Sequence, residues 1–268
     1  MRYQVDHDFH IHSQLSDCSS DPLQTNERIL EYAKSNGLKE IYLTNHIWDK
    51  NVACDYLDPF YYEQDSEHIF KALPLPKDEN VKFTLGCETE FDKNCVLGLS
   101  RENFDRFGFI IIPTTHLQMH GFTISNSRLS LDSRAQLWGE RLEKLLSMDL
   151  PFHKIGIAHP ACRLMAKSSR EDYLKVLDMI PDKTIYSVFE KASKLGVGVE
   201  LNGEDMNFSP NETDTVLRMF KIAKKCGCKF YLGSDAHHPE ALDRAKATFE
   251  RAIDLLELDE NDKFHIKN

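Results

Sequence analysis

Three segments of this sequence place two metal-binding side chains two residues apart. The pairs are His10 with His12, Glu88 with Glu90, and Asp235 with His237. Successive side chains point to opposite faces of a β-strand, so the members of each pair share a face if the segment is extended. Both side chains of a pair can then reach one metal ion.

Single histidines follow three further apolar segments of the chain. They are His46, His116 and His159. A lone histidine in such a place is more often an ordinary boundary residue than a ligand. Its recurrence at the end of successive segments is better explained by a shared site.

The combination of neutral imidazoles with carboxylates suits zinc, manganese or iron better than calcium or magnesium, which prefer oxygen ligands. The set is larger than one ion requires, since a catalytic zinc uses about three protein ligands. We therefore expect two or three divalent metal ions bridged by a carboxylate. Such clusters activate a bridging water and stabilise an oxyanion, as in displacement at phosphorus.

The elements that would position these ligands alternate along the chain. Strand-like segments are expected at residues 5–12, 40–46, 82–91, 107–116, 154–159, 197–202 and 229–235. Helical periodicity is found at residues 26–35, 134–147, 171–179, 186–195, 213–225 and 239–256. Gly37, Gly196 and Gly227 each follow a helical stretch, as expected of helix C-termini. This alternation predicts parallel βα units.

Seven successive parallel strands can close into a barrel or spread into an open sheet. Only a barrel brings every strand end to one mouth, where the βα loops carry the chemistry. We therefore predict an α/β fold with a seven-stranded, TIM-like (β/α)7 barrel, formed by one domain over residues 1–268. The long segments 51–76 and 117–132 would be flaps around the mouth.

The composition narrows the range of partners. There are 43 acidic and 33 basic residues, for a formal charge of -10, which disfavours a nucleic-acid surface. No signal segment or membrane-length apolar run is apparent, and seven cysteines form no disulfide framework, so we expect a cytoplasmic protein with free thiols and no membrane contact. An anionic substrate would then need bound cations or a few placed basic side chains. The oligomeric state is left open.

The ordered motifs resemble those of the PHP (polymerase and histidinol phosphatase) superfamily, over nearly the whole chain. They are Asp8-Phe9-His10-Ile11-His12-Ser13, Thr44-Asn45-His46, Gly86-Cys87-Glu88, Thr115-His116, His159-Pro160 and Gly233-Ser234-Asp235-Ala236-His237. The resemblance implies a distorted seven-stranded barrel with a trinuclear metal centre.

Carried over residue by residue, the resemblance assigns nine ligands, with Glu88 as a bridge between two ions. His10, His12, Glu88 and Asp235 would hold the first ion; Glu88, His116 and His159 the second; Asp17, His46 and His237 the third. Glu88 and Asp235 are accordingly the expected catalytic carboxylates.

Four acidic or amide residues lie at or beside these ligands in the sequence: Asn45, Asp17, Asp8 and Glu90. Asn45 stands where many members have an acidic residue, and Asp17, where relatives use His or Asp, could also be a helix or turn cap. Asp8 is expected to share the inward face of His10 and His12 and to orient them. Glu90 is either a supporting residue or a plain strand carboxylate.

Arg163, four residues after His159, is the arginine nearest in sequence to the ligands. We expect it to bind the substrate phosphate as a bidentate, catalytic clamp; the alternative is a solvated loop arginine. Lys167 is a weaker candidate of the same kind.

The expected function is hydrolysis of a small phosphomonoester by a metal-bridging hydroxide, with L-histidinol phosphate, an intermediate of histidine biosynthesis, as the first candidate. A metal-dependent amidohydrolase or deaminase is the alternative enzyme, although Glu88 and the Asp235–His237 pair are atypical of that group. A non-catalytic PHP regulatory module is the alternative outside enzymes, but a degenerate copy should have lost ligands.

Overall fold

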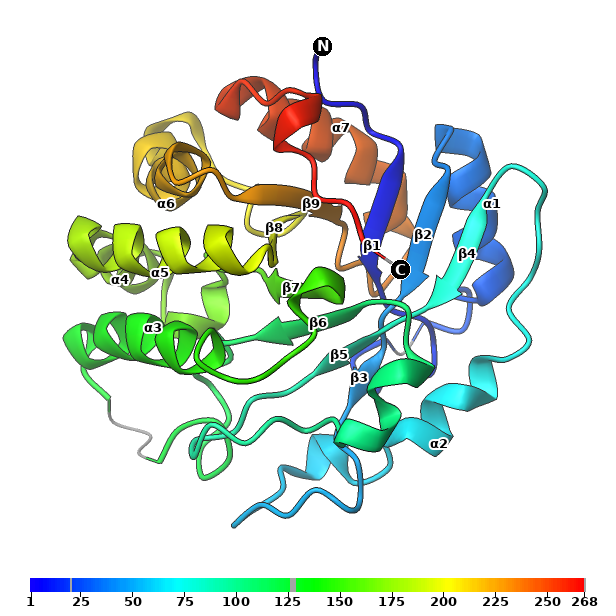
Figure 1. Cartoon of the computed structure of the whole chain (residues 1–268), viewed down its shortest axis with the longest axis horizontal. Coiled ribbons are helices and arrows are strands. Elements are labelled where there is room, and N and C mark those ends of the chain that lie inside the picture. Colours follow the sequence, from blue (N-terminus) through cyan, green and yellow to red (C-terminus); the bar gives the residue numbers. More distant parts are fainter. Residues whose placement is uncertain (20, 126–128, 268) are drawn as a thin grey trace.

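The computed structural model describes residues 1–19, 21–125 and 129–267 (Figure 1). All paired strands in it run parallel, in two sheets of order β1-β2-β4 and β3-β5-β6-β7-β8-β9. The strands are β1 His7–Ile11, β2 Glu40–Leu43, β3 His46–Ile47, β4 Lys82–Leu85, β5 Cys87–Thr89, β6 Ile110–Pro113, β7 Ile155–Ala158, β8 Gly198–Asn202 and β9 Lys229–Gly233.

Two of the seven expected strands are interrupted. The second is divided into β2 and β3 at Thr44 and Asn45, and the third into β4 and β5 at Gly86. A Cβ atom at Gly86 would lie 2.7 Å from the carbonyl oxygen of Phe109, so only glycine allows this close approach. The chain therefore moves from one sheet to the other along these two paths.

The barrel closes between β1 and the residues after β9. The backbone N–H of His12 donates to the carbonyl of Ala236 at 3.1 Å, and that of Asp235 to the carbonyl of His10 at 2.7 Å. Nearer the start of β1 the connection is made by a side chain, because Asp8 Oδ1 accepts a hydrogen bond from the N–H of Ser234 at 2.9 Å. Figure 1 shows β1 beside both β2 and β9. The predicted distorted seven-stranded barrel is confirmed.

A bulge in β1 sets the direction of the residues that matter most. Asp8 is paired with Ile41 and Ile11 with Leu43, so β1 has one residue more than β2 over this span. Asp8 consequently lies on the helix-facing side, where the hydroxyl of Tyr32 donates to Asp8 Oδ2 at 3.0 Å. The expectation that Asp8 shares the inward face of His10 and His12 was wrong, because the bulge interrupts the alternation.

Helices pack around the outside of the strands (Figure 1). The longer ones are α1 Asn26–Asn36, α3 Leu131–Leu145, α4 Arg170–Met179, α5 Asp182–Leu195, α6 Thr213–Lys225 and α7 Pro239–Leu256; α2 Ser66–Ile69 is a single turn. Gly37 and Gly196 end α1 and α5 in the left-handed conformation, both with φ of 71°, as predicted. No helix in the described ranges has the length and apolarity needed to cross a bilayer.

Aromatic side chains fill the barrel below the site. Phe9, Tyr42, Phe109 and Tyr231, from four different strand paths, form one buried cluster that Phe264 joins near the C-terminus. Mainly aliphatic residues on the opposite faces of the strands pack against the helices. The interior is thus a packed core that supports the strand ends from beneath.

Replacing Asp8 tests the closure of the barrel. Asp8→Ala leaves the N–H of Ser234 and the hydroxyl of Tyr32 buried without a partner, so we expect the free energy of unfolding to fall by about 2 to 4 kcal/mol. Asp8→Asn retains an acceptor and should cost about 1 kcal/mol. Denaturant unfolding measures both. Asp254→Asn, in an exposed ion pair with Arg2, is the control, and an equal small effect of all three changes would contradict this role of Asp8.

Candidate metal centre

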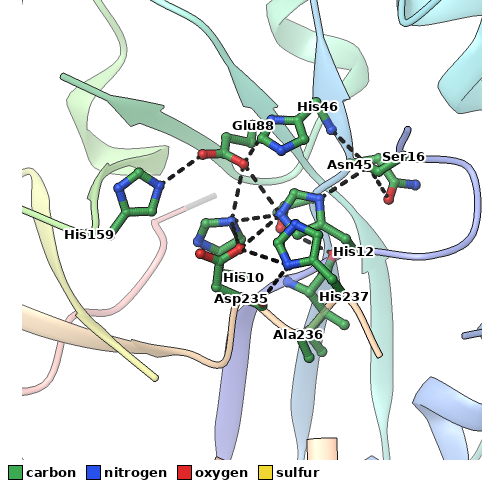
Figure 2. A network of polar contacts seen from close by, with 12 residues as sticks. His10, His12, Ser16, Asn45, His46, Glu88, His159, Asp235, Ala236 and His237 are labelled. Atoms are coloured by element: carbon green, nitrogen blue, oxygen red, sulfur yellow. Dashed lines mark hydrogen bonds and ion pairs between the residues drawn. The ribbon is translucent and has the colours of Figure 1, made fainter. Parts of the chain in front are cut away.

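Two imidazoles and two carboxylates converge at the mouth of the barrel (Figure 2). Glu88 Oε2 lies 3.3 Å from the Nε2 atoms of both His10 and His12. Asp235 Oδ1 lies 3.2 Å from His10 Nε2 and 3.1 Å from His12 Nε2. Four potential ligand atoms are thereby within reach of one ion.

Glu88 connects this central group to the residues on either side. Its Oε2 atom lies 3.0 Å from His46 Nδ1, and its Oε1 atom lies 3.1 Å from His159 Nε2. The two carboxylate oxygens therefore face different sets of imidazoles (Figure 2). This is the arrangement that a carboxylate bridging two ions requires.

Two flanking groups extend the central one, and in each the possible ligand atoms lie within 4.8 Å of one another. One group contains His116, His159 and Cys162; the other contains His12, Cys18, His46 and His237. The structure thus brings together eight of the nine expected ligands: His10, His12, His46, Glu88, His116, His159, Asp235 and His237.

Asp17 is the ninth expected ligand, and the structure does not place it with the others. Its side chain is exposed, and its backbone N–H donates to Gln64 Oε1 at 3.0 Å. The next residue, Cys18, faces the group instead. Cys18 and Cys162 were expected only to be free thiols, and all seven cysteines are indeed unpaired. Cys18 directly follows Asp17, and Cys162 lies three residues after His159. This proximity to expected ligands was the sequence signal that could have identified both cysteines.

The Nδ1 atoms of several of these histidines are engaged outside the centre. His10 Nδ1 donates to Glu200 Oε1 at 2.7 Å, and His116 Nδ1 to Glu90 Oε2 at 2.7 Å. A carboxylate oxygen can only accept, so in both rings the other nitrogen is free to bind a metal. Glu90 is therefore a supporting residue, which resolves the two alternatives for this position.

Glu200 is the supporting residue that sequence reasoning missed. It lies in β8 with a completely buried side chain, and its second oxygen accepts from the backbone N–H of His159 at 2.5 Å. One carboxylate thus fixes His10 and the turn that carries His159. A glutamate between Val199 and Leu201 in a buried strand was the signal, since carboxylates are rarely buried without a partner.

Asn45 supports the site through the loop that follows β1. Its Oδ1 atom accepts from the N–H of Ser13 at 2.8 Å and from the hydroxyl of Ser16 at 3.0 Å. Ser16 Oγ in turn accepts from His12 Nδ1 at 3.1 Å. The Asn45 amide therefore orients His12 indirectly, through the hydroxyl of Ser16 (Figure 2).

The carboxylates and imidazoles at the centre shift one another's pKa values in both directions. Burial lowers the pKa of His10, but the carboxylates of Asp235, Glu200 and Glu88 outweigh burial and raise this pKa well above its ordinary value, so a metal ion bound to His10 must displace a proton. Burial raises the pKa of Glu88, but the imidazoles of His46 and His10 outweigh burial and hold the pKa well below its usual range. Burial lowers the pKa of His237 to about 4 and that of His46 well below its ordinary value. At neutral pH the carboxylate is ionised and these two imidazoles are neutral.

Two of the candidate ligands have unusual backbone conformations. The φ angles of His159 and Asp235 are 25° and 54°, values that side chains other than glycine rarely adopt. Residues 235–237 are therefore not extended, and the condition under which Asp235 and His237 would share a strand face is not met, because β9 ends at Gly233. His237 still reaches the site, through a turn in which its Nδ1 donates to the carbonyl of Asp235 at 2.7 Å.

A cavity of about 370 Å³ opens onto the centre. Besides the metal-type residues, it is lined by Asp58, Phe60, Tyr61, Gln118, Met119, Leu164 and Lys167. Both Lys167 and Arg163 are exposed, but Lys167 is the one lysine or arginine of the described chain in this lining and Arg163 lies outside it. The structure therefore does not support the expected clamp by Arg163. A larger cavity of about 640 Å³ between α3 and α5 contains none of the clustered histidines.

The donor set fits divalent transition metals. His46 Nδ1 is buried and makes no hydrogen bond, although it lies 3.0 Å from Glu88 Oε2 without the required alignment. An unpartnered nitrogen beside a buried carboxylate is costly unless a cation lies between them. Zinc, with its preference for imidazole, carboxylate and thiolate, suits these groups.

The bridge and the exposed aspartate make a matched pair for mutation. Glu88→Gln should weaken zinc binding roughly a hundredfold or more, because even the loss of a ligand's hydrogen-bond partner costs roughly tenfold to a hundredfold. Asp17→Asn should leave zinc affinity unchanged. Competition with a chromophoric chelator measures both constants. A larger loss in Asp17→Asn than in Glu88→Gln would overturn the assignment.

Comparison with known proteins identifies the fold. No family profile and no curated protein sequence matches the chain. Among solved structures, the histidinol phosphate phosphatase of Lactococcus lactis subsp. lactis Il1403, in complex with zinc, L-histidinol and phosphate, is similar with a TM-score of 0.61 at 14% identity, over 92% of this chain and 93% of that one. A Listeria monocytogenes protein assigned as a histidinol phosphatase gives a TM-score of 0.60 at 16% identity, over 91% and 99%. The chain therefore shares the overall fold of these two proteins, in agreement with the fold that its ordered motifs predicted.

Proposed function

We propose that this chain is a metal-dependent phosphoesterase that hydrolyses a small phosphomonoester. The observation that carries the proposal is the buried carboxylate of Glu88, which faces imidazoles on two sides and adjoins a cavity of about 370 Å³. The cavity volume is in the range of small-molecule sites. The fold shared with histidinol phosphate phosphatases agrees with this chemistry.

The first ion would be held by His10, His12, Glu88 and Asp235. The second would be held by His116 and His159 together with Glu88, whose Oε1 atom lies 3.1 Å from His159 Nε2. Divalent ions bound there would lower the pKa of a coordinated water and stabilise charge on the phosphoryl oxygens. The protein itself fixes the ligands through Glu200 and Glu90 and excludes bulk water from the buried imidazoles.

L-histidinol phosphate is the first candidate substrate. Its phosphate would lie at the metal centre, with Lys167 supplying a positive charge from the cavity wall. Its ammonium group would be matched by the carboxylate of Asp58, and its imidazole by the ring of Phe60, which also line the cavity. The Lactococcus protein was crystallised with L-histidinol and phosphate, the two products of this reaction.

A substrate panel separates this proposal from an amidohydrolase. Phosphomonoesters, phosphodiesters and amides are offered to the zinc- or manganese-loaded protein. The proposal expects turnover of phosphomonoesters. Turnover of amides alone would replace it, and turnover of none would favour a non-catalytic module.

Lys167 and Arg163 are compared as a basic residue inside the cavity lining and one outside it. Lys167→Ala should weaken inhibition by inorganic phosphate and lower kcat/KM by roughly fivefold, because an exposed ion pair contributes about 1 kcal/mol. Arg163→Ala should leave both constants unchanged. The effect of Lys167 should shrink at high salt. A larger effect of Arg163→Ala would restore the clamp expected from the sequence.

Asp58 tests the identity of the leaving group. Asp58→Asn removes the charge that would face a substrate ammonium, so kcat/KM for L-histidinol phosphate should fall by roughly fivefold to tenfold. Phenyl phosphate, which has no ammonium group, should be hydrolysed as by the wild type. Equal losses for both substrates would mean that Asp58 acts through the loop that it caps at Phe60 and not through the substrate.

A further inference from the structure

The loop after β1 holds Cys18 in a fixed place at the metal centre. Ser16, two residues earlier, is buried and donates to Asn45 Oδ1 at 3.0 Å. Ser19, one residue later, is buried and donates to the carbonyl of His237 at 2.8 Å. The loop is therefore fastened on both sides of Cys18, to the second strand path and to the turn after β9.

The loop turns Cys18 toward the centre and Asp17 away from it. The Cys18 sulfur lies within 4.8 Å of a ring nitrogen from each of His12, His46 and His237, and Cys18 lines the cavity. The Asp17 carboxylate, in contrast, is exposed. The thiol thus occupies the place that the resemblance would give to an oxygen ligand.

Of the four residues in this group, Cys18, His46 and His237 each have an atom that can bind a further ion. Both ring nitrogens of His12 are engaged, because Nε2 faces Glu88 and Asp235 and Nδ1 donates to Ser16 Oγ. His237 uses only Nδ1, toward the carbonyl of Asp235, and His46 Nδ1 has no hydrogen-bond partner. Cys18, His46 and His237 therefore form a set of three ligands, the number that a catalytic zinc site uses with one position open.

We propose that Cys18, as a thiolate, binds a third divalent ion together with His46 and His237. A thiolate is a soft ligand and favours zinc over manganese, so this flank of the site would select zinc. Ion binding would release the thiol proton to the buffer, because a metal-bound cysteine is a thiolate. The inference rests on the metal centre of the proposed function but not on its phosphate chemistry.

Cobalt(II) detects a thiolate ligand directly, through a thiolate-to-cobalt charge-transfer band in the near ultraviolet. Cys162, in the other flanking group, could also give this band, so the test is made in a Cys162→Ser background. Chelator-treated protein is reloaded with cobalt(II). We expect the band in Cys162→Ser and its loss when Cys18→Ser is added. A further change of Cys226→Ser, at the end of α6, is the matched control and should leave the band intact.

Zinc retention after dialysis gives a second readout that does not depend on activity. Cys18→Ser should bind its weakest zinc roughly tenfold to a hundredfold less tightly than the wild type, whereas Asp17→Asn should not. Cys18→Asp should keep the ion but give no charge-transfer band, which guards against a folding defect in Cys18→Ser.

The proposal is overturned if Cys162→Ser shows no band, if the band survives the loss of both cysteines, or if Asp17→Asn and not Cys18→Ser loses zinc. A protein that shows the Cys18-dependent band but hydrolyses no phosphomonoester would refute the proposed function and leave the thiolate ligand standing.

Discussion

The Glu88 carboxylate is buried where the strand ends converge, and its charge must be compensated there by the groups around it (Figure 2). Its side chain is 1% exposed, and Glu90 and Glu200 nearby are completely buried. Ionised carboxylates are costly to remove from water unless positive or hydrogen-bonding groups surround them. Here imidazoles contact Glu88 from several strand ends, and bound cations would complete the compensation. The supporting carboxylates each receive an imidazole N–H, so orientation and charge compensation are achieved by the same contacts.

The barrel provides this arrangement through its irregular features. The bulge in β1 directs both His10 and His12 inward, and side-chain and backbone contacts from β1 hold the turn after β9 in place. His159 and Asp235 have backbone conformations that would be unfavourable alone. Each is held by a hydrogen bond from its own N–H, to Glu200 and to the carbonyl of His10 respectively. Strain at the ligands is thus balanced by contacts with neighbouring strands.

The sequence was sufficient to predict the barrel and most of the candidate ligands, because histidines or carboxylates recur at the ends of successive strand-like segments. It could not reveal the bulge that turns Asp8 outward, since alternation assumes an unbroken strand. The directions of Asp17 and Cys18, and of Arg163 and Lys167, depend on loop conformations that side-chain type does not determine. Glu200 could not be predicted from the strand-end pattern, because it lies within β8 and not at its end.

Metal analysis combined with a phosphatase assay would show whether hydrolysis by this chain depends on bound metal ions. Purified protein would be analysed for zinc, manganese and iron by plasma mass spectrometry, then assayed with L-histidinol phosphate before chelation, after chelation and after each metal is restored. A metal-dependent mechanism predicts at least two bound ions per chain, loss of hydrolysis on chelation and its return with zinc or manganese. Hydrolysis that persists in demonstrably metal-free protein would contradict it.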